Sequence, residues 1–237
     1  MASADVMRGR LRLDVSELDI VARVGTDDGQ AGRMLGQALR PTGAMPDGRL
    51  APWADQLLTV VARPAMRLVV ELFAIERTES SIWATPALAV LGEPRPEGII
   101  ELSGVEPIML PHLVAWLVGL RNRPRPTEPA AITTSITELA KLEQAARSGA
   151  APDTALARLI AVRRFSWRIT SVWVSPSGPH RGELHVVDGD TAGLWRIHVA
   201  DRKAADPVLT FEPTSASAIW KAIVGLLPTS EVLQDAA

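Results

Sequence analysis

Two histidines and the acidic residues beside them form the pattern best suited to chemistry. The stretch His185-Val-Val-Asp188-Gly-Asp190 places an imidazole three residues before a carboxylate, and His198 follows on the next apolar run. A small-molecule hydrolase or metal enzyme could use His185, Asp188 and His198, because such groups serve as general bases and metal ligands. The same residues also describe a strand ending in an Asp-Gly turn, a strong hairpin signal. No second cluster of ligands accompanies them, so the hairpin is favoured.

Other catalytic signatures are missing from the sequence. No Gly-x-Ser-x-Gly elbow occurs, and the segment Gly25-Thr-Asp-Asp-Gly29 lacks the Lys and Ser/Thr of a phosphate loop. Cysteine is absent, which excludes disulfides, thiolate metal sites and a cysteine nucleophile. We therefore expect no catalytic residues, no metal and no cofactor, and a protein that is not an enzyme.

Composition narrows the classes of partner. The chain has 237 residues, of which 47% are hydrophobic, and its net charge is −2. A protein that binds nucleic acid through bulk charge needs a cationic surface, so no nucleic-acid partner is expected. No apolar run approaches the ~20 residues of a membrane span, and the first residues lack a signal-peptide core. We expect a cytoplasmic protein without membrane insertion.

Hydrophobic periodicity assigns strands and helices. The predicted strands cover 8–15, 66–77, 82–91, 98–103, 165–174, 182–187, 194–200 and 208–211, with turns at RTESS and GEPRPEG. One short helix is predicted after a cap at Ser16, another begins at Pro52, and two more cover about 108–120 and 215–227. A helical hairpin is predicted between Ile132 and Ile160. Its first helix has Ser135 and Glu138 at capping-box spacing. The Gly- and Asp-rich segment 26–48 has at most a helical turn around Met34–Leu39.

A strand followed by a Glu-Pro turn and a helix occurs twice. A shift of 106 residues places Glu106-Pro107 on Glu212-Pro213, and the units are 99–120 and 206–228. The repeat therefore predicts an α+β fold with a pseudo-two-fold duplicated unit, in which two related sheets meet and each is covered by its own helix. We divide the chain into an N-terminal half (1–120), a linker (121–130) and a C-terminal half (131–237), which together form one compact domain.

The linker RNRPRPTEP is rich in proline and arginine, which favours an extended conformation. Its arginines are either solvated, as most charge runs are, or contact an acidic partner.

The strands of the C-terminal half alternate between apolar and polar residues. This alternation predicts an apolar face covered by helices and a polar face open to solvent. The polar face and the predicted loop Pro176–Arg181 form the predicted partner-binding surface. Its residues are Arg168, Pro176, His180, Arg181, His185, Arg196 and His198. The seven tryptophans are expected mainly in the core, with one or two as partner anchors.

Five stretches together resemble one protein family. They are RLRLDVSELDIVARVG, GRLAPWADQLLTVVARP, MRLVVELF, GIIELSGVEPIMLPHLVAWLVGL and DPVLTFEPTSASAIWKAIVGLL. The combination resembles the EspG family of type VII (ESX) secretion-associated proteins of actinobacteria.

The resemblance implies a pseudo-two-fold α+β fold, in which both halves contribute to one twisted antiparallel sheet flanked by helices. It also implies a cytosolic chaperone that binds one end of a helical PE–PPE pair and keeps it soluble and export-competent. A WxG-type helical hairpin is the alternative substrate. A hydrolase or metal enzyme, and a structural protein that forms homodimers or larger oligomers through its sheet edge, remain the competing hypotheses.

Overall fold

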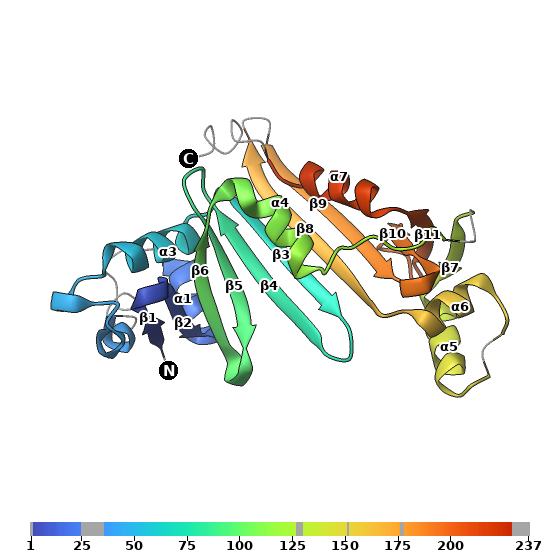
Figure 1. Ribbon diagram of the computed structural model, residues 1–237, viewed down its shortest axis with the longest axis horizontal. Coiled ribbons are helices and arrows are strands. Elements are labelled where there is room, and N and C mark those ends of the chain that lie inside the picture. Colours follow the sequence, from blue (N-terminus) through green and yellow to red (C-terminus); the bar gives the residue numbers. More distant parts are fainter. Residues whose placement is uncertain (1, 25–35, 127–129, 151, 176–177, 229–237) are drawn as a thin grey trace.

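The computed structural model describes residues 2–24, 36–126, 130–150, 152–175 and 178–228 (Figure 1). The predicted segment 26–48 lies partly outside these ranges; within them, 36–39 are helical. None of the described helices is long and apolar enough to cross a membrane.

All strands of the described residues belong to one antiparallel sheet of eleven strands. Their order across the sheet is β1-β2-β6-β5-β4-β3-β8-β9-β10-β11-β7. The strands are β1 (Ser3–Asp5), β2 (Arg10–Asp14), β3 (Met66–Phe73), β4 (Arg77–Ala84), β5 (Ala89–Arg95), β6 (Ile99–Val105), β7 (Ile132–Ser135), β8 (Phe165–Ser175), β9 (Gly178–Asp188), β10 (Leu194–Ala200) and β11 (Val208–Thr214). The α+β class predicted from periodicity is confirmed.

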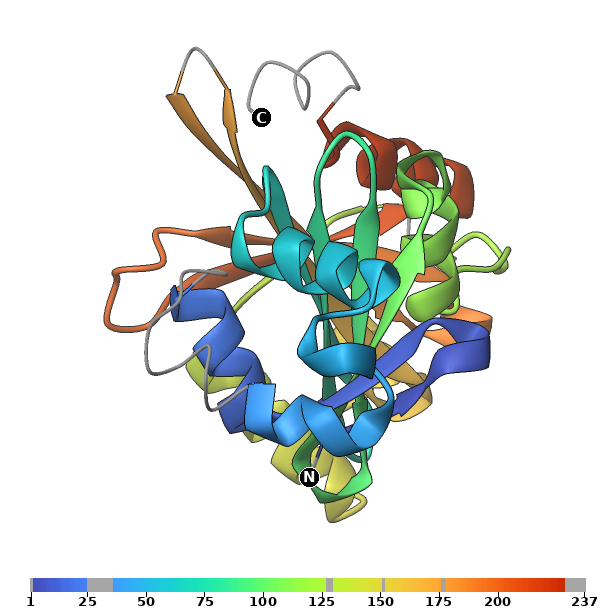
Figure 2. The same cartoon turned by 90° about the vertical axis from the view of Figure 1, so that its left-hand side faces the viewer.

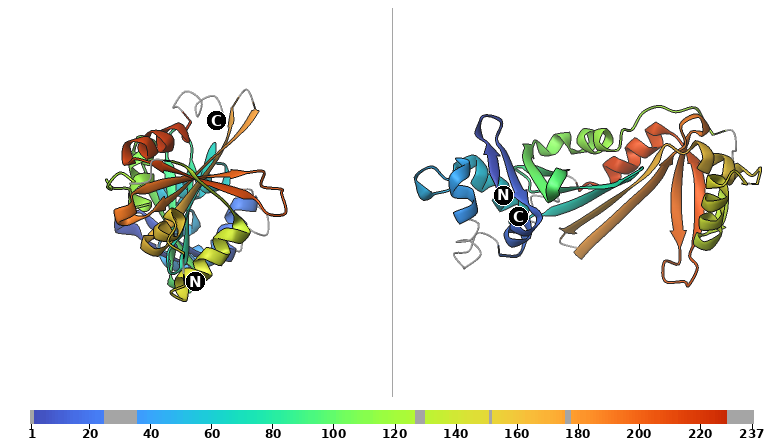
Figure 3. Two further views of the ribbon diagram at one scale, coloured as in Figure 1. Left: turned by 90° about the vertical axis from the view of Figure 1, so that its right-hand side faces the viewer. Right: turned by 90° about the horizontal axis from the view of Figure 1, so that it is seen from below.

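The α-helices lie on both faces of this sheet. They are α1 (Val15–Val24), α3 (Pro52–Ala62), α4 (Leu110–Leu117), α5 (Ile136–Arg147), α6 (Ala155–Val162) and α7 (Ala216–Gly225). Seen from below, α4 and α7 follow the same face, while α1 with α3 and α5 with α6 lie at opposite ends of the molecule (Figure 3). The end-on view shows the strand directions fanning out, which is the expected twist of a large sheet (Figure 2).

The predicted duplication is confirmed by the topology. The order β2, α1, α3, β3, β4, β5, β6, α4 recurs as β7, α5, α6, β8, β9, β10, β11, α7. The two copies join where β3 pairs with β8 over their whole overlap, from Met66–Trp173 to Phe73–Ser166. They therefore form one continuous sheet rather than two sheets that meet.

The two copies even start their first helices in the same way. In the first copy the Glu17 N–H donates to Asp14 Oδ1 (2.8 Å), and the Asp14 N–H donates to Glu17 Oε2 (2.9 Å). In the second, the Glu138 N–H donates to Ser135 Oγ (3.2 Å). These bonds satisfy backbone donors that a helix start leaves free. The predicted Ser135 cap is confirmed, whereas the predicted Ser16 cap is wrong because Asp14 occupies that position.

The 106-residue alignment of the Glu-Pro pairs is wrong by three residues. The pair Ala89–Val105 between β5 and β6 corresponds to Leu194–Thr214 between β10 and β11, so Val105 matches Thr214 at an offset of 109. The same offset superposes the buried residues Leu110 and Ile219. Burial, rather than a shared dipeptide, sets the register, since Pro213 lies inside β11.

Local boundaries differ from the predictions at several places. Within the predicted turn GEPRPEG, Gly92–Arg95 belong to β5, and the turn is limited to the 3-10 helix Pro96–Gly98. The residues RTESS lie inside β4, and the turn comes earlier, at 74–76; the predicted strand 82–91 is the end of β4, a turn and the start of β5. Ile132 opens the edge strand β7, which pairs with β11, instead of the predicted helix. A four-residue strand has too few apolar positions to show a period.

The core is divided between the two faces. Below α4 and α7 it contains Leu68, Val70, Trp167 and Ile169 of the two central strands. On the opposite face, one cluster lies under α1 and α3, and another, built around Trp195, lies under α6. The prediction of one helix-covered apolar face for the C-terminal half is therefore wrong, because α7 and α6 cover opposite sides.

Glu101 carries a buried charge in the N-terminal copy. Its side chain is 1% exposed and accepts hydrogen bonds from Arg10 (2.8 Å), Arg12 (2.7 Å) and Arg95 (2.7 Å). Burial by itself raises the pKa of Glu101, but the hydrogen bonds from Arg95 and Arg12 outweigh it and lower the pKa from 4.5 to about 2. The charged form is therefore stabilised by folding.

We expect Glu101→Gln to lower the free energy of unfolding at pH 7 by about 3 kcal/mol, the linkage value of such a shift. Because the folded pKa is depressed, this stabilisation is present above pH 4.5 and is lost as the pH falls through about 2. Denaturant titrations across this range should therefore show the two proteins converging in acid. Glu93→Gln, at a more exposed carboxylate on the same face, is the control; an equal effect there would contradict the assignment.

Candidate functional site: the central face of the sheet

No described helix covers the middle of the sheet on the side opposite α4 and α7. We call this area the central face. Its residues come from β3, β4, β8 and β9 and include Arg67, Val69, Glu71, Phe73, Arg77, Arg168, Thr170, Val172, Val174, Arg181, Glu183 and His185. The register places them on one side, since directly paired residues of neighbouring strands project from the same face.

A charged network occupies one end of the central face. Glu71 is 4% exposed, and its carboxylate accepts hydrogen bonds from Arg168 Nε (2.5 Å) and Arg77 Nη2 (2.5 Å). The hydrogen bond from Arg168 is the main cause that lowers the pKa of Glu71. The network fixes both guanidinium groups and keeps this end of the face polar and ordered.

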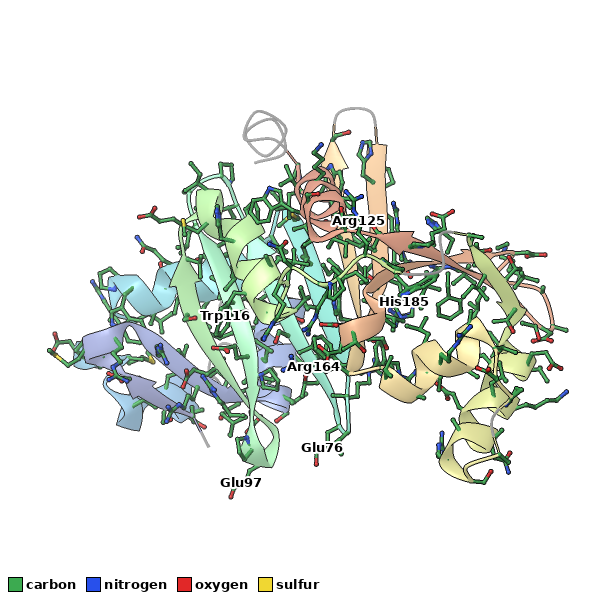
Figure 4. The ribbon with its side chains drawn as sticks, turned by 45° about the vertical axis from the view of Figure 1, so that its right-hand side comes forward. Glu76, Glu97, Trp116, Arg125, Arg164 and His185 are labelled. Atoms are coloured by element: carbon green, nitrogen blue, oxygen red, sulfur yellow. The ribbon has the colours of Figure 1, made fainter. Side chains whose placement is uncertain are left out.

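Phe73 lies beneath both arginines of this network. The guanidinium carbons of Arg77 and Arg168 lie 5.8 and 5.9 Å from the ring centroid, within cation–π range. His185, which Figure 4 labels, packs beside the same ring, with 6.2 Å between the two ring centroids. Burial, with the nearby charge of Arg168, lowers the pKa of His185 to about 4. The imidazole is therefore neutral near pH 7, and its buried Nε2 has no hydrogen-bond partner within the described residues.

The other end of the central face combines exposed valines with arginines. Arg67, Val172 and Arg181 are direct neighbours across three strands. Val172 is 42% exposed and Val174 58% exposed. Both arginines are exposed, and neither forms an ion pair within the part of the chain that the structure describes. Apolar side chains with arginines beside them are typical of protein–protein contact surfaces.

The structure separates the seven predicted partner-binding residues. Arg168, Arg181 and His185 lie on the central face. Arg196 pairs with Val186 and therefore lies on the opposite face, together with His198.

His180 also lies on that opposite face, stacked on Trp173 at 5.3 Å. Pro176 falls outside the described residues. The predicted grouping of Arg168 and His185 with Arg196 and His198 is therefore corrected. Val186 and Val187 are adjacent in β9 and both are buried, so the strand is covered on both sides there. Two adjacent valines in an otherwise alternating strand were the sequence signal that could have shown that both faces are covered.

The structure does not bring together His185, Asp188 and His198, the residues that the hydrolase hypothesis requires. His185 packs on Phe73, His198 Nε2 lies 2.9 Å from Glu212 Oε2, and Asp188 accepts hydrogen bonds from Arg123. Each of the three residues that the competing hydrolase hypothesis would use thus has a different partner. Among the described residues, no group of three or more acidic or histidine side chains could hold a metal ion.

The sequence-based prediction did not single out Glu71, Phe73 or Val172. A charged residue in the middle of the apolar run MRLVVELF was the available signal for Glu71, because a carboxylate on a central strand needs partners. Val172 gave no such signal, since an exposed valine and a buried one look alike in a strand.

Comparison with known proteins adds one relevant structure. No protein-family model matches the chain, and no curated protein sequence is significantly similar to it. Among solved structures, it matches the type VII secretion system chaperone EspG5 of Mycobacterium tuberculosis, solved in complex with a PE25–PPE41 dimer. The TM-score is 0.56 at 12% identity, over 92% of this chain and 97% of that chain. The chain shares its fold with EspG5. Because the match covers nearly all of both chains, the likeness concerns the whole duplicated architecture.

Proposed function

We propose that this protein is a cytosolic chaperone-like adaptor of a type VII secretion system. It binds helical secreted substrates, of the PE–PPE or WxG type, and keeps them soluble and export-competent. The observation that carries this proposal is that nearly the whole chain has the fold of EspG5. EspG5 was solved in complex with a PE25–PPE41 dimer. The family resemblance of the sequence points the same way, and a chaperone needs neither a metal nor a catalytic cluster.

The central face is the contact surface in this proposal. The Glu71–Arg168–Arg77 network holds one end rigid. The Val172 end offers apolar area between two arginines that form no ion pair with any described residue. A helical tip that inserts its apolar residues there would cover the valines and place acidic groups near Arg67 and Arg181. Ordered contact residues reduce the entropy lost on binding.

The binding experiment uses the full chain and helical pairs encoded in the same genome. We expect co-expression with a cognate PE–PPE or WxG-type pair to yield a stable complex of defined mass in size-exclusion chromatography with light scattering. The pair should also stay soluble only when the protein is present. A purified protein that forms homodimers and captures no such pair would instead favour the structural-protein hypothesis.

Val172→Glu should weaken binding of the helical pair by at least about tenfold, because it places a carboxylate at the centre of the apolar contact. Isothermal titration measures the change. Val208→Glu is the matched control: Val208 is 41% exposed on β11, and the register places it on the face opposite Val172. Equal losses in both variants would indicate a general effect of the added charge and would contradict the assignment of the central face.

A further inference from the structure

A small hollow lies at the C-terminal end of α4, away from the central face. Its volume is about 220 Å³, and it is a shallow, open depression bordered by α4, the turn at Gly119, the end of β3 and the start of β8. Leu117 and Phe165 supply apolar walls, while Trp116, Arg121 and Arg164 complete the lining. Because α4 covers the side of the sheet opposite the central face, this hollow is a separate surface.

Trp116 is far more exposed than the fold requires. Its side chain is 69% exposed, whereas Leu110 and Val114 of the same helix are buried in the core. The 109-residue offset between the strand–helix units, β6 with α4 and β11 with α7, places Trp116 on Gly225 of α7, a position with no side chain. The second copy therefore forms the same strand–helix unit without a tryptophan at this position. An exposed tryptophan that does not pack in the core is a typical anchor for a protein partner.

The charge around Trp116 is positive and uncompensated. Arg121 and Arg164 are both exposed, and neither forms an ion pair with any residue in the described ranges. Among the described residues, no carboxylate lines the hollow. Arg164 is held in place, because its guanidinium carbon lies 5.6 Å from the Phe165 ring centroid and its N–H donates to the Asp188 carbonyl oxygen (2.9 Å). Figure 4 shows Trp116 and Arg164 on the same part of the molecule, with Arg125 apart from them near α7.

The size of the hollow decides between a small ligand and a peptide. Pockets for small-molecule ligands usually measure about 300–1,000 Å³, which is more than this hollow offers. A space of this volume accommodates one apolar side chain, with flanking groups left outside it. The two arginines lie at the positions where such flanking groups would be, and they are complementary to carboxylates.

We infer that the hollow at Trp116 binds an acidic segment of a partner protein that carries a single leucine or phenylalanine. The apolar side chain enters the hollow against Leu117 and Phe165, and Trp116 covers it. Asp or Glu residues on either side pair with Arg121 and Arg164. The site works independently of the helical-substrate contact, so a second protein could bind while the central face is occupied.

Fluorescence anisotropy with labelled peptides tests this inference on the full-length protein. The probe is a short peptide with a single phenylalanine between two pairs of glutamates, and the comparison peptide has lysines in place of the glutamates. We expect the glutamate peptide to bind, with an affinity that falls as salt is added, and the lysine peptide not to bind. Binding of both peptides, or of neither at about 1 mM, would overturn the inference.

Variants locate the binding to the hollow. Trp116→Ala, and separately the pair Arg121→Glu with Arg164→Glu, should each weaken the glutamate peptide by about tenfold or more. Arg49→Glu, at an exposed arginine elsewhere, should leave the affinity within about twofold. All these positions are exposed, so thermal unfolding should confirm that the variants remain folded. Unchanged affinity in the Trp116 and arginine variants, or displacement of the peptide by inorganic phosphate alone, would refute the site.

Discussion

Arg123→Ala is expected to lower the free energy of unfolding by about 3–5 kcal/mol, the range measured when one partner of a buried ion pair is removed. Arg123 Nε and Nη2 donate to Asp188 Oδ2 at 3.2 and 2.8 Å, and Nη1 donates to Asp190 Oδ1 at 2.6 Å. The Asp188 side chain is only 3% exposed and that of Arg123 11% exposed. Without the guanidinium, a buried carboxylate would lose its only cationic partner in the described part of the chain.

This ion pair fastens the linker to the C-terminal copy. The same segment packs on Gly193, where an added Cβ would lie 2.6 Å from the Pro124 carbonyl oxygen. The hypothesis that the linker arginines are simply solvated is therefore wrong for Arg123, which serves the fold. The division of the chain into two halves at 121–130 stays a prediction, since a tightly packed linker does not by itself delimit domains.

Chemical denaturation of three variants checks the role of Arg123. Arg121→Ala removes an exposed arginine from the same linker and should change stability by less than about 0.5 kcal/mol. Adding Asp188→Asn to Arg123→Ala should recover part of the loss, because the buried charge is then neutral. An Arg123→Ala protein as stable as the wild type would show that the ion pair does not hold the linker.

The second large effect is expected at the junction of the two copies. Trp167 is 1% exposed and lies beside Leu72 of β3 and Val186 of β9, in the core beneath α4 and α7. Trp167→Ala should lower the free energy of unfolding by about 3–5 kcal/mol through lost burial and the cavity left behind.

The same substitution at Trp116 is the natural control for Trp167→Ala. Trp116 is 69% exposed, so its replacement should cost less than about 1 kcal/mol. Guanidinium titrations of both variants should give a single transition with an unchanged slope, because both copies share the sheet. A separate early transition in Trp167→Ala would mean that the copies unfold independently and that the junction is weaker than its packing indicates.

The sequence predicted individual elements well where local chemistry determines them. The alternation of β10 gave its bounds, Leu194–Ala200, and the Ser135 cap follows from a short hydrogen-bonded motif. Such features depend on neighbouring residues alone, so a single sequence contains them. The duplication could also be predicted, because it repeats an apolar pattern over a whole unit.

The side of the sheet that each helix covers could not be predicted from alternation. A period of two separates the faces of one strand but does not relate them to the next strand. Arg196 and His185 therefore looked equivalent, although pairing places them on opposite faces. The network around Glu71 likewise joins residues almost a hundred positions apart, which only the β3–β8 pairing brings together.

The most direct test of the proposed function is isothermal titration of a cognate helical pair into the wild type, Val172→Glu and Val208→Glu under the same conditions. The proposal predicts tight binding to the wild type and to Val208→Glu, and binding at least about tenfold weaker for Val172→Glu. Binding that is equal in all three proteins would contradict the central face as the contact surface, and the absence of binding to the wild type would contradict the chaperone function itself.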